Sequence, residues 1–367
     1  MAGITVGDIT SCLSQFAPPV FQEGYDNAGL ITGSPTDTVS GVLVSLDCTE
    51  DVVREAISGG CNMVVAHHPI IFKGLRRLTG GNYVERTIIL AIRHNIAIYA
   101  IHTNLDNVLA GVNRRICDKI GLSNLKILAP RTDTLLKLVT FVPSAHKGAV
   151  LDALHQAGAG QIGNYKNCSF SVTGTGTFMP NEAADPHVGV ANQQEWVDEE
   201  RLEVILPLDR QQAVLKALKG AHPYEEVAFY LSTLVNENQE VGSGMIGELK
   251  TPAEPIDFIM SLKQRMELTM VRHTALLKRP IKKVAVCGGA GSFLLPRAIQ
   301  AGADVFVSAD FKYHEFFDAD DKIIVADIGH YESEAFTKDL IVEVLTKKFP
   351  TFAINFSKTV TNPISYS

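Results

Sequence analysis

The chain has little of what marks membrane, secreted or nucleic-acid-binding proteins. No run of 18 apolar residues occurs, so no segment predicts a helix that spans a bilayer. The N-terminus lacks a basic start followed by an apolar stretch, so we expect no signal peptide. The net charge is -7, and no basic stretch is long enough to suggest a footprint for nucleic acid. We therefore expect a cytoplasmic protein with no membrane or nucleic-acid partner.

Cysteine is also scarce and has no motif spacing. The six cysteines are scattered along the chain and none of them forms a C-x-x-C pair. This pattern argues against a zinc ribbon and against a disulfide framework, and it indicates a reducing compartment. Hydrophobic residues make up 46% of the 367 residues, so the chain can bury ample core and is long enough for more than one domain.

The two ends of the chain alternate strands with helices. In the first third we expect strands at 40–47, 62–68 and 96–102, and helices at 49–60, 83–95 and 109–122. Residues 282–310 repeat the strand, helix, strand pattern, and residues 321–349 add one more strand and a long helix. Strands alternating with helices of this length predict βαβ units and a largely parallel sheet.

The middle of the chain has a different order. Strands are expected at 135–143, 168–180, 200–208 and 226–234, and helices at 148–158 and 210–220. This β-α-β-β-α-β order is that of the split βαβ, ferredoxin-like arrangement. We therefore expect an α+β domain at 131–240 inserted into an α/β core that 1–130 and 241–367 form together; two consecutive domains are the alternative.

Polar side chains follow the expected strands of the core. His67 and His68 end the run "VVAHHPIIF", and "HTNLD" carries His102 and Asp106 after the next strand. Asp310 and His314 follow the strand within 282–310, and His330 and Glu334 follow the strand within 321–349. The carboxyl ends of parallel strands meet at one edge of a sheet, where ligands bind.

Taken alone, each of these residues has an ordinary structural explanation. Asp106 would cap a helix, and Glu334 would suit the first turn of a helix because of the helix dipole. Together, imidazoles and carboxylates from three strand ends favour a divalent metal site, and His330 and Glu334 at i and i+4 lie on one helix face. Successive side chains of an extended chain point to opposite faces, so His67 and His68 favour two ions bridged by a carboxylate, with Glu334 the favoured bridge.

Two further motifs are less specific. "CGGAGS" (287–292) lies between a strand and a helix but is neither G-x-G-x-x-G nor a P-loop, so it is either a tight turn or a helix N-terminus that holds an anion. "HPYEEV" (222–227) follows a helix of the middle region, and we interpret it as a loop feature.

These motifs together resemble the NIF-three-like family, whose members are often named GTP cyclohydrolase I type 2 homologues. The resemblance rests on "VVAHHPIIFKGLRRL", "YAIHTNLDNVLAGVN", "VFVSADFKYHE", "ADIGHYESE" and, near the N-terminus, "YDNAGL", in the expected order from residue 25 to residue 334. One departure is the sequence Ser308-Ala309-Asp310, where many members of the family have a glycine before the aspartate.

The resemblance implies an α/β core with a dinuclear metal centre and, in this member, an inserted PII/CutA-like domain. It implies a ring-shaped homohexamer with metal sites facing its interior. The implied ligands of the two divalent ions (Zn, Fe, Mn or Co) are His67, His68, Asp106, His330 and Glu334, and the implied pocket histidine near them is His314, which would move protons.

Two functions are compatible with these residues and with the resemblance. One is a metal-dependent, cyclohydrolase-like hydrolase acting on a nucleotide-like or phosphorylated small molecule. The other is a regulatory or metal-handling oligomer that binds ions or partners without turnover.

Overall fold

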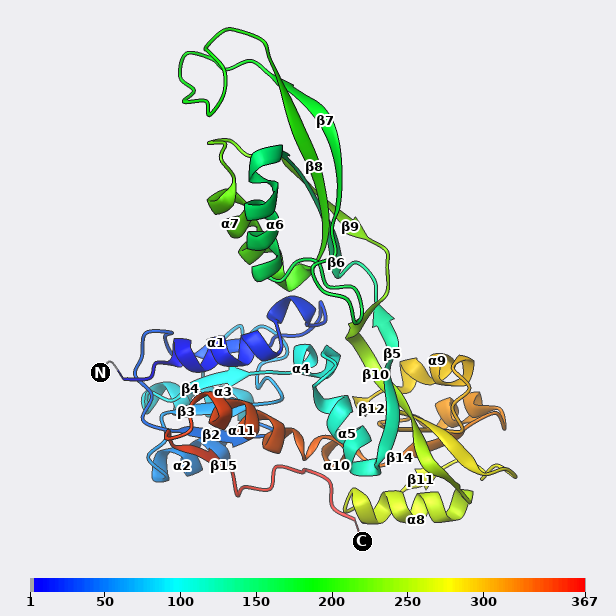
Figure 1. The fold of residues 1–367 in the computed structure, drawn as a ribbon. Helices are drawn as coiled ribbons and strands as arrows, with labels where there is room; N and C mark the ends of the chain where they lie inside the picture. The colour runs from blue at the N-terminus through cyan, green and yellow to red at the C-terminus, as the bar shows by residue number, and fades with distance from the viewer. Residues whose placement is uncertain (1–2, 367) are drawn as a thin grey trace. The chain divides into compact units, whose positions relative to one another are not determined.

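The computed structural model describes residues 3–366, which divide into two units, each with a hydrophobic core of its own. Unit 1 consists of two segments, Met1–Pro130 and Gln239–Ser367, and unit 2 is Arg131–Asn238. The chain leaves and re-enters unit 1 through β5 (Leu122–Arg131) and β10 (Asn238–Ala253), which are neighbouring strands of one sheet (Figure 1).

Unit 1 contains two sheets where the sequence pattern suggested one largely parallel sheet. The five-stranded sheet has the order β1-β4-β3-β2-β15, with β1 Gly29–Thr32, β4 Ala97–Ala100, β3 Met63–Ala66, β2 Val42–Ser45 and β15 Ile354–Phe356. The six-stranded sheet has the order β11-β14-β13-β12-β10-β5, with β11 Arg272–His273, β14 Ile324–Asp327, β13 Val305–Ala309 and β12 Ile281–Ala290. Strands β15, β2, β3 and β4 run parallel, as do β12, β13 and β14. Strand β1 pairs antiparallel with β4, β10 with β12, and β11 with β14.

Helices cover these sheets. Those of unit 1 are α1 Val6–Phe16, α2 Glu50–Ser58, α3 Tyr83–Arg93, α4 Thr103–Asn107, α5 Val112–Ile120, α8 Pro255–Arg265, α9 Leu295–Gln300, α10 His330–Glu334 and α11 Thr337–Lys348. The predicted cap is confirmed at α2, where the Thr49 side chain accepts a hydrogen bond from the backbone of Val52. No helix among residues 3–366 is long and apolar enough to cross a membrane.

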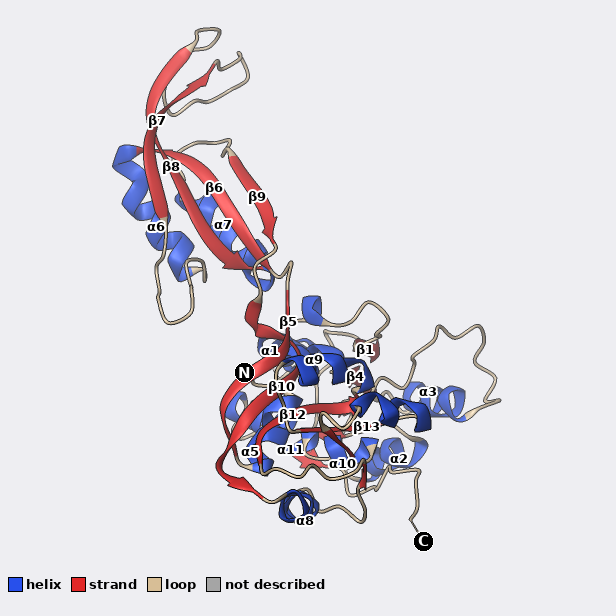
Figure 2. Ribbon diagram, turned by 90° about the vertical axis from the view of Figure 1, so that its right-hand side faces the viewer, coloured by secondary structure: helices blue, strands red, loops and turns tan. Residues whose placement is uncertain are grey.

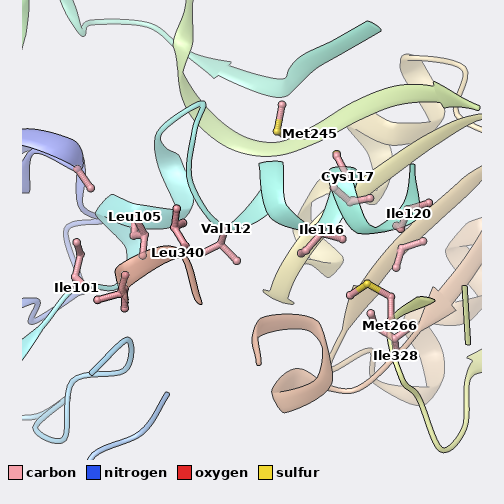
Figure 3. Packing of buried hydrophobic residues seen from close by; sticks show 14 of the residues in the cluster. Ile101, Leu105, Val112, Ile116, Cys117, Ile120, Met245, Met266, Ile328 and Leu340 are labelled. Carbon is pink, nitrogen blue, oxygen red and sulfur yellow. The ribbon is translucent and has the colours of Figure 1, made fainter. Parts of the chain in front are cut away.

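The largest hydrophobic core joins the two sheets. Alternate residues of β2, such as Val42 and Val44, belong to the same buried cluster as Val284 and Val286 of β12, whereas Leu43 belongs to a cluster that includes residues of α2 and α3. Figure 3 shows Val112, Ile116 and Ile120 of α5 in this core with Met245 of β10. Successive side chains of a strand point to opposite faces of the sheet. The residues that are buried in the core therefore determine which face the side chains at the end of each strand occupy.

Unit 2 has one four-stranded antiparallel sheet and two helices. Its order is β7-β8-β6-β9, with β6 Leu135–Pro143, β7 Phe170–Phe178, β8 Glu195–Pro207 and β9 Phe229–Leu234. Helices α6 (Lys147–Gln156) and α7 (Gln211–Ala221) lie on the same face of the sheet (Figure 2). Leu202, Val204 and Leu206 of β8 pack under them in a core of their own.

Candidate metal centre

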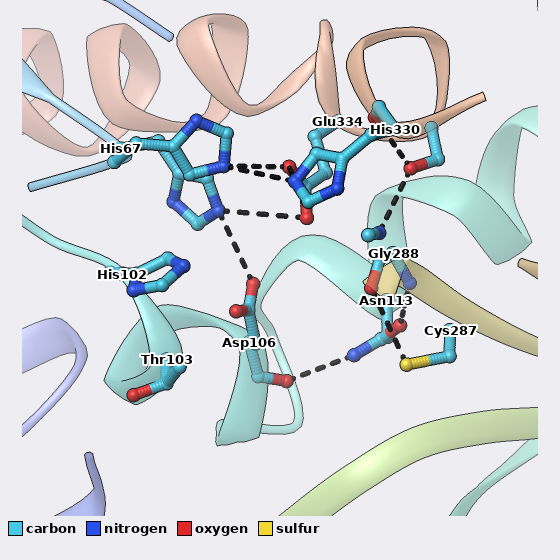
Figure 4. A network of polar contacts seen from close by, with 12 residues as sticks. His67, His102, Thr103, Asp106, Asn113, Cys287, Gly288, His330 and Glu334 are labelled. Atoms are coloured by element: carbon cyan, nitrogen blue, oxygen red, sulfur yellow. Dashed lines mark hydrogen bonds and ion pairs between the residues drawn. The ribbon is translucent and has the colours of Figure 1, made fainter. Parts of the chain in front are cut away.

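Four histidines and two carboxylates converge at the ends of strands from both sheets of unit 1. His67 and His68 follow β3, and His102 and Asp106 lie at and within α4, after β4 of the same sheet. His330 and Glu334 begin and end α10, which follows β14 of the six-stranded sheet (Figure 4). The expectation of a single sheet edge is therefore wrong, because two sheets packed on one core each present part of the cluster.

Each histidine has one ring nitrogen held by an oxygen outside the cluster. His67 Nδ1 lies 2.8 Å from the carbonyl oxygen of Ile101. In the other three histidines, Nδ1 lies 2.6–2.8 Å from a carboxylate oxygen: Asp47 for His68, Asp26 for His102 and Asp310 for His330. A ring whose Nδ1–H is donated in this way directs its Nε2 toward the cluster, where it can bind a metal that displaces any proton there, as in carboxylate–histidine–metal arrangements.

The ligand atoms fall into three groups, each with all atoms within 4.8 Å of one another. One group is His68, His330 and Glu334, a second is His67, Asp106 and Glu334, and a third is His67, His68 and His102. Glu334 is the residue that the first two groups share. Its Oε2 lies 2.9 Å from His68 Nε2 and 3.1 Å from His330 Nε2, and its Oε1 lies 4.0 Å from His67 Nε2.

Two buried polar atoms of the cluster have no hydrogen-bond partner among the described residues. They are His67 Nε2 and Asp106 Oδ1, which face one another at 3.5 Å. Leaving such atoms buried and unpaired costs about 1–3 kcal/mol each, so native proteins rarely do so without a ligand. A divalent cation would satisfy both atoms, and neutral imidazole with carboxylate suits Zn, Fe, Mn or Co. The residues present therefore fit a metal.

The pKa shifts of the clustered residues are consistent with a site that a bound cation would stabilise. Burial lowers the pKa of His67 to about 3, so this imidazole is neutral and can act as a ligand. Burial and the nearby Glu334 carboxylate raise the pKa of Asp106 well above its ordinary value. Despite burial, hydrogen bonds to carboxylates raise the pKa of His68 to about 10 and that of His330 to about 9, and these two rings hold the pKa of Glu334 low.

The glycines of "CGGAGS" give Glu334 room. Gly288 and Gly289 belong to β12, and a Cβ added at Gly289, where φ is +61°, would lie 2.5 Å from Glu334 Oε1. The amide of Gly288 donates to Asn113 Oδ1 and that of Gly289 to Ser333 Oγ, both at 2.9 Å. The predicted turn is therefore the end of a strand that leaves space for the Glu334 side chain. Because both amides already have hydrogen-bond partners, neither is available to bind an anion.

His314 lies apart from the groups of ligand atoms. It is exposed in the short 3-10 segment Tyr313–Ala319, where its ring stacks on Phe317 at 6.2 Å between centroids. The five predicted ligands, by contrast, all belong to the three groups.

His102 joins the cluster although the predicted ligand set left it out. Its ring lies 5.2 Å from that of His67 and 5.4 Å from that of His68. Its position at a strand end in "HTNLD" is the signal that pointed to it. Asp310, which holds His330, has the same strand-end signal, whereas Asp26, which holds His102, follows no expected strand and is brought to the site by a contact distant in sequence.

Comparison with known proteins agrees with this fold. A family model described as Duf34/NIF3 (NGG1p interacting factor 3) matches residues 4–363. The chain belongs to this family. A Halalkalibacterium halodurans relative named GTP cyclohydrolase 1 type 2 homolog is 40% identical over 341 residues, covering 92% of this chain and 91% of the relative. A Bacillus subtilis relative of the same name is 36% identical over 364 residues, covering 98% of this chain and 97% of the relative.

Solved structures of this family share the fold. A Bacillus cereus protein related to NIF3 superposes with a TM-score of 0.87 at 36% identity, covering all of both chains. A Staphylococcus aureus protein superposes with a TM-score of 0.79 at 30% identity, again over the full length of both. The predicted family and the predicted α/β class are thus confirmed, and the mixed α/β fold with several sheets matches that of these structures.

Proposed function

We propose that this member of the Duf34/NIF3 family binds two divalent metal ions and acts as a metal-dependent hydrolase. The observation that supports two ions is the position of Glu334, whose two carboxylate oxygens face different ligand groups. His68 and His330 would hold one ion and His67 and Asp106 the other, with Glu334 as the bridge. His102 lies close enough to His67 and His68 to add a ligand.

The chemistry follows from the donor set. Held by these residues, two divalent ions would supply Lewis-acid polarisation of a carbonyl or phosphoryl oxygen and a more nucleophilic water at neutral pH. The chain's own residues orient this centre: Asp47, Asp26 and Asp310 fix the imidazole rings through Nδ1. His314 is proposed to exchange protons with the substrate, which its exposure to solvent permits.

An exposed aromatic side chain supports a substrate with a planar ring. Phe72 is 53% exposed, and its ring lies 5.8 Å from that of His102. A nucleotide-like or phosphorylated small molecule would place its base on such a face and its reacting group at the ions. This substrate class agrees with the name of the relatives, GTP cyclohydrolase 1 type 2 homolog.

Metal content of purified variants tests the proposal. By elemental analysis we expect about two ions per wild-type chain, about one in His330→Ala and in Asp106→Asn, and almost none in Glu334→Gln, because Glu334 serves both ions. The exposed His94, outside the cluster, provides the control: His94→Ala should keep about two. Full occupancy in Glu334→Gln would disprove the bridge.

Activity separates the hydrolase from the alternative, a non-catalytic metal-binding or regulatory oligomer. A screen of nucleotides and phosphate esters should reveal saturable, metal-dependent hydrolysis that His314→Ala reduces while metal content is retained. Full metal loading without turnover in such a screen would favour the alternative.

Unit 2 is proposed to be an inserted ferredoxin-like domain of the PII/CutA type, with boundaries near 131 and 240. The order β6-α6-β7-β8-α7-β9 and the pairing of β6 with both β8 and β9 support this assignment. Assembly into a homohexameric ring stays a prediction of the family resemblance, and light scattering at micromolar concentration tests it.

A further inference from the structure

Unit 2 carries a cavity that the proposed hydrolase does not use. The cavity has a volume of about 660 Å³, within the range of small-molecule sites, and its lining residues all lie between 141 and 230. It occupies the face of the sheet opposite the helices, because Phe141 of β6 and Val172 of β7 both pair with Arg201 of β8, whose neighbour Leu202 is buried in the helix-side core.

Aromatic side chains form much of the wall. Phe178 ends β7, and its ring lies 6.1 Å from that of Tyr224. The ring of His187 lies 6.1 Å from that of Tyr224 on another side, and Phe141 and Tyr230 pair at 5.9 Å. Tyr224 belongs to "HPYEEV", the motif that the sequence alone suggested was a loop feature. Aromatic faces present negative charge density to whatever they enclose.

A buried carboxylate lies among these rings. Glu199 is only 8% exposed, and its Oε1 accepts a hydrogen bond from the Tyr224 hydroxyl at 2.9 Å. Its Oε2 occupies the space above Gly176 of β7, where an added Cβ would collide with it. Gly176 therefore keeps room for this carboxylate against the sheet.

The charges of the cavity favour a cationic occupant. Besides Glu199, the residues Glu225 and Glu226 line it, and the carboxylate of Glu225 accepts a hydrogen bond from the amide of Asp185. The guanidinium of Arg201, which also lines the cavity, is already paired with Glu203 at 2.7 Å. A carboxylate held among aromatic rings is the arrangement that recognises an organic ammonium group, through a charge-assisted hydrogen bond and cation–π attraction.

We propose that this cavity binds a small organic amine in its cationic form, carried on an aromatic or similarly apolar body. Glu199 would accept the ammonium hydrogen bond, and Phe178, Tyr224 and Tyr230 would enclose the body. An inorganic metal ion is a poorer match, because all three groups of metal-type ligands found among residues 3–366 lie in unit 1. This site is separate from the proposed hydrolase and needs none of its ligands.

Calorimetry on the full chain tests the proposal with two pairs of probes. Tryptamine and phenethylamine should bind, whereas indole-3-propionate and phenylpropionate, which carry the same rings on an anion, should bind at least about tenfold more weakly. Treatment with a chelator should leave the affinity for the amines unchanged, so failure of the metal centre and failure of this site are distinguishable.

Two variants of unit 2 locate the binding. Glu199→Gln keeps the shape and the acceptor for Tyr224 but removes the charge, and it should weaken amine binding by about tenfold or more. The control is Glu200→Gln, the next residue of β8, whose carboxylate lies near Lys147 of α6 on the opposite face and should leave binding unchanged. Gly176→Ala, which displaces the Glu199 carboxylate, should also abolish binding.

Three outcomes would overturn the proposal. The first is that neither amine binds, and the second is that the propionates bind as tightly as the amines. The third is that Glu199→Gln keeps the wild-type amine affinity. A change in its particle size in solution would then make this face a contact between copies of the chain.

Discussion

The hydroxyl of Thr361 donates a hydrogen bond to Asp47 Oδ2 at 2.5 Å, while Oδ1 of the same carboxylate lies 2.8 Å from His68 Nδ1. A residue near the C-terminus thus orients a proposed ligand through one intermediate carboxylate. Despite burial, the hydrogen bonds from His68 and Thr361 lower the pKa of Asp47, so it remains an acceptor. Partners of this kind fix the orientation and basicity of a ligand imidazole.

Thr361→Val should therefore weaken metal binding without removing any ligand. We expect affinity to fall by about tenfold, the lower end of the range for partners of metal ligands. Competition with a fluorescent chelator measures the change. Thr361→Ser, which retains the hydroxyl, is the matched control, and equal affinities for the two variants would show that the contact does not matter to the ion.

Gly289→Ala should expel metal as well as destabilise the fold. The new Cβ would meet Glu334 Oε1 at 2.5 Å, and the backbone is left-handed there, with φ at +61°. Gly302→Ala separates the two effects, because φ is +71° but the nearest atom to the new Cβ, Lys283 Nζ, is 4.0 Å away. Both variants should lose about 1 kcal/mol or more of unfolding free energy from backbone strain.

Only Gly289→Ala should lose metal, as measured by elemental analysis beside thermal or urea unfolding. Equal metal contents in the two variants would mean that Glu334 does not need the space above Gly289.

The C-terminal segment should detach in acid through protonation of Glu55. This carboxylate accepts hydrogen bonds from the amides of Lys358 and Thr359 and from the Ser357 hydroxyl. Despite partial burial, these bonds lower the pKa of Glu55 from 4.5 to about 2. Since the folded-state pKa is depressed, the stabilisation is complete above about pH 4.5 and is lost as the pH falls toward about 2.

Hydrogen exchange measured by mass spectrometry checks this. Protection factors for the peptide around 357–361 should decline through this acidic window, whereas those of β15 should not. In Glu55→Gln the segment should already be weakly protected at neutral pH. Strong protection there would argue that other contacts hold it.

Unit 2 should fold alone and be dispensable for metal binding. It has its own buried cluster, and every residue of the three ligand groups lies outside 131–238. A peptide of residues 131–238 should show a cooperative unfolding transition by circular dichroism. A chain in which a short flexible linker joins residues 130 and 239 should keep its ions, because β5 and β10 are neighbouring strands. Loss of metal from such a folded chain would contradict the prediction.

The cluster of candidate ligands is easier to predict from sequence than the sheets that position it. His67, His68 and Glu334 could be selected because strand ends and helix starts are where a periodic apolar pattern stops, and that boundary is local in sequence. Whether strands belong to one sheet or two depends on pairing between distant segments, which local periodicity does not encode. The sequence therefore indicates the residues that cluster in the structure, but it does not indicate that two sheets bring them together.

Strand β10 has a sequence whose strand character is hard to recognise from local residue preferences. It carries Gly242, Gly244 and Gly247, which normally weaken a strand. The structure explains two of them by crowding: a Cβ at Gly242 would collide with the Ala129 carbonyl, and one at Gly247 would lie 2.5 Å from a Leu125 side-chain carbon. Glycine at these positions lets neighbouring segments approach closely. This is a requirement of the tertiary structure, whereas strand-propensity scales treat glycine only as unfavourable to a strand.

The proposed ligands are divided between the two ends of the chain, so they become available at different times during synthesis. His67, His102 and Asp106 leave the ribosome early, but His330, Glu334 and the Thr361 that steadies Asp47 belong to roughly the last tenth of the chain. A nascent chain can complete its N-terminal strands and all of unit 2 before the bridging carboxylate exists. If these residues hold metal as proposed, metal binding is a late event that needs the whole chain, and a chain that terminates before residue 330 has the early histidines but lacks the rest of the site.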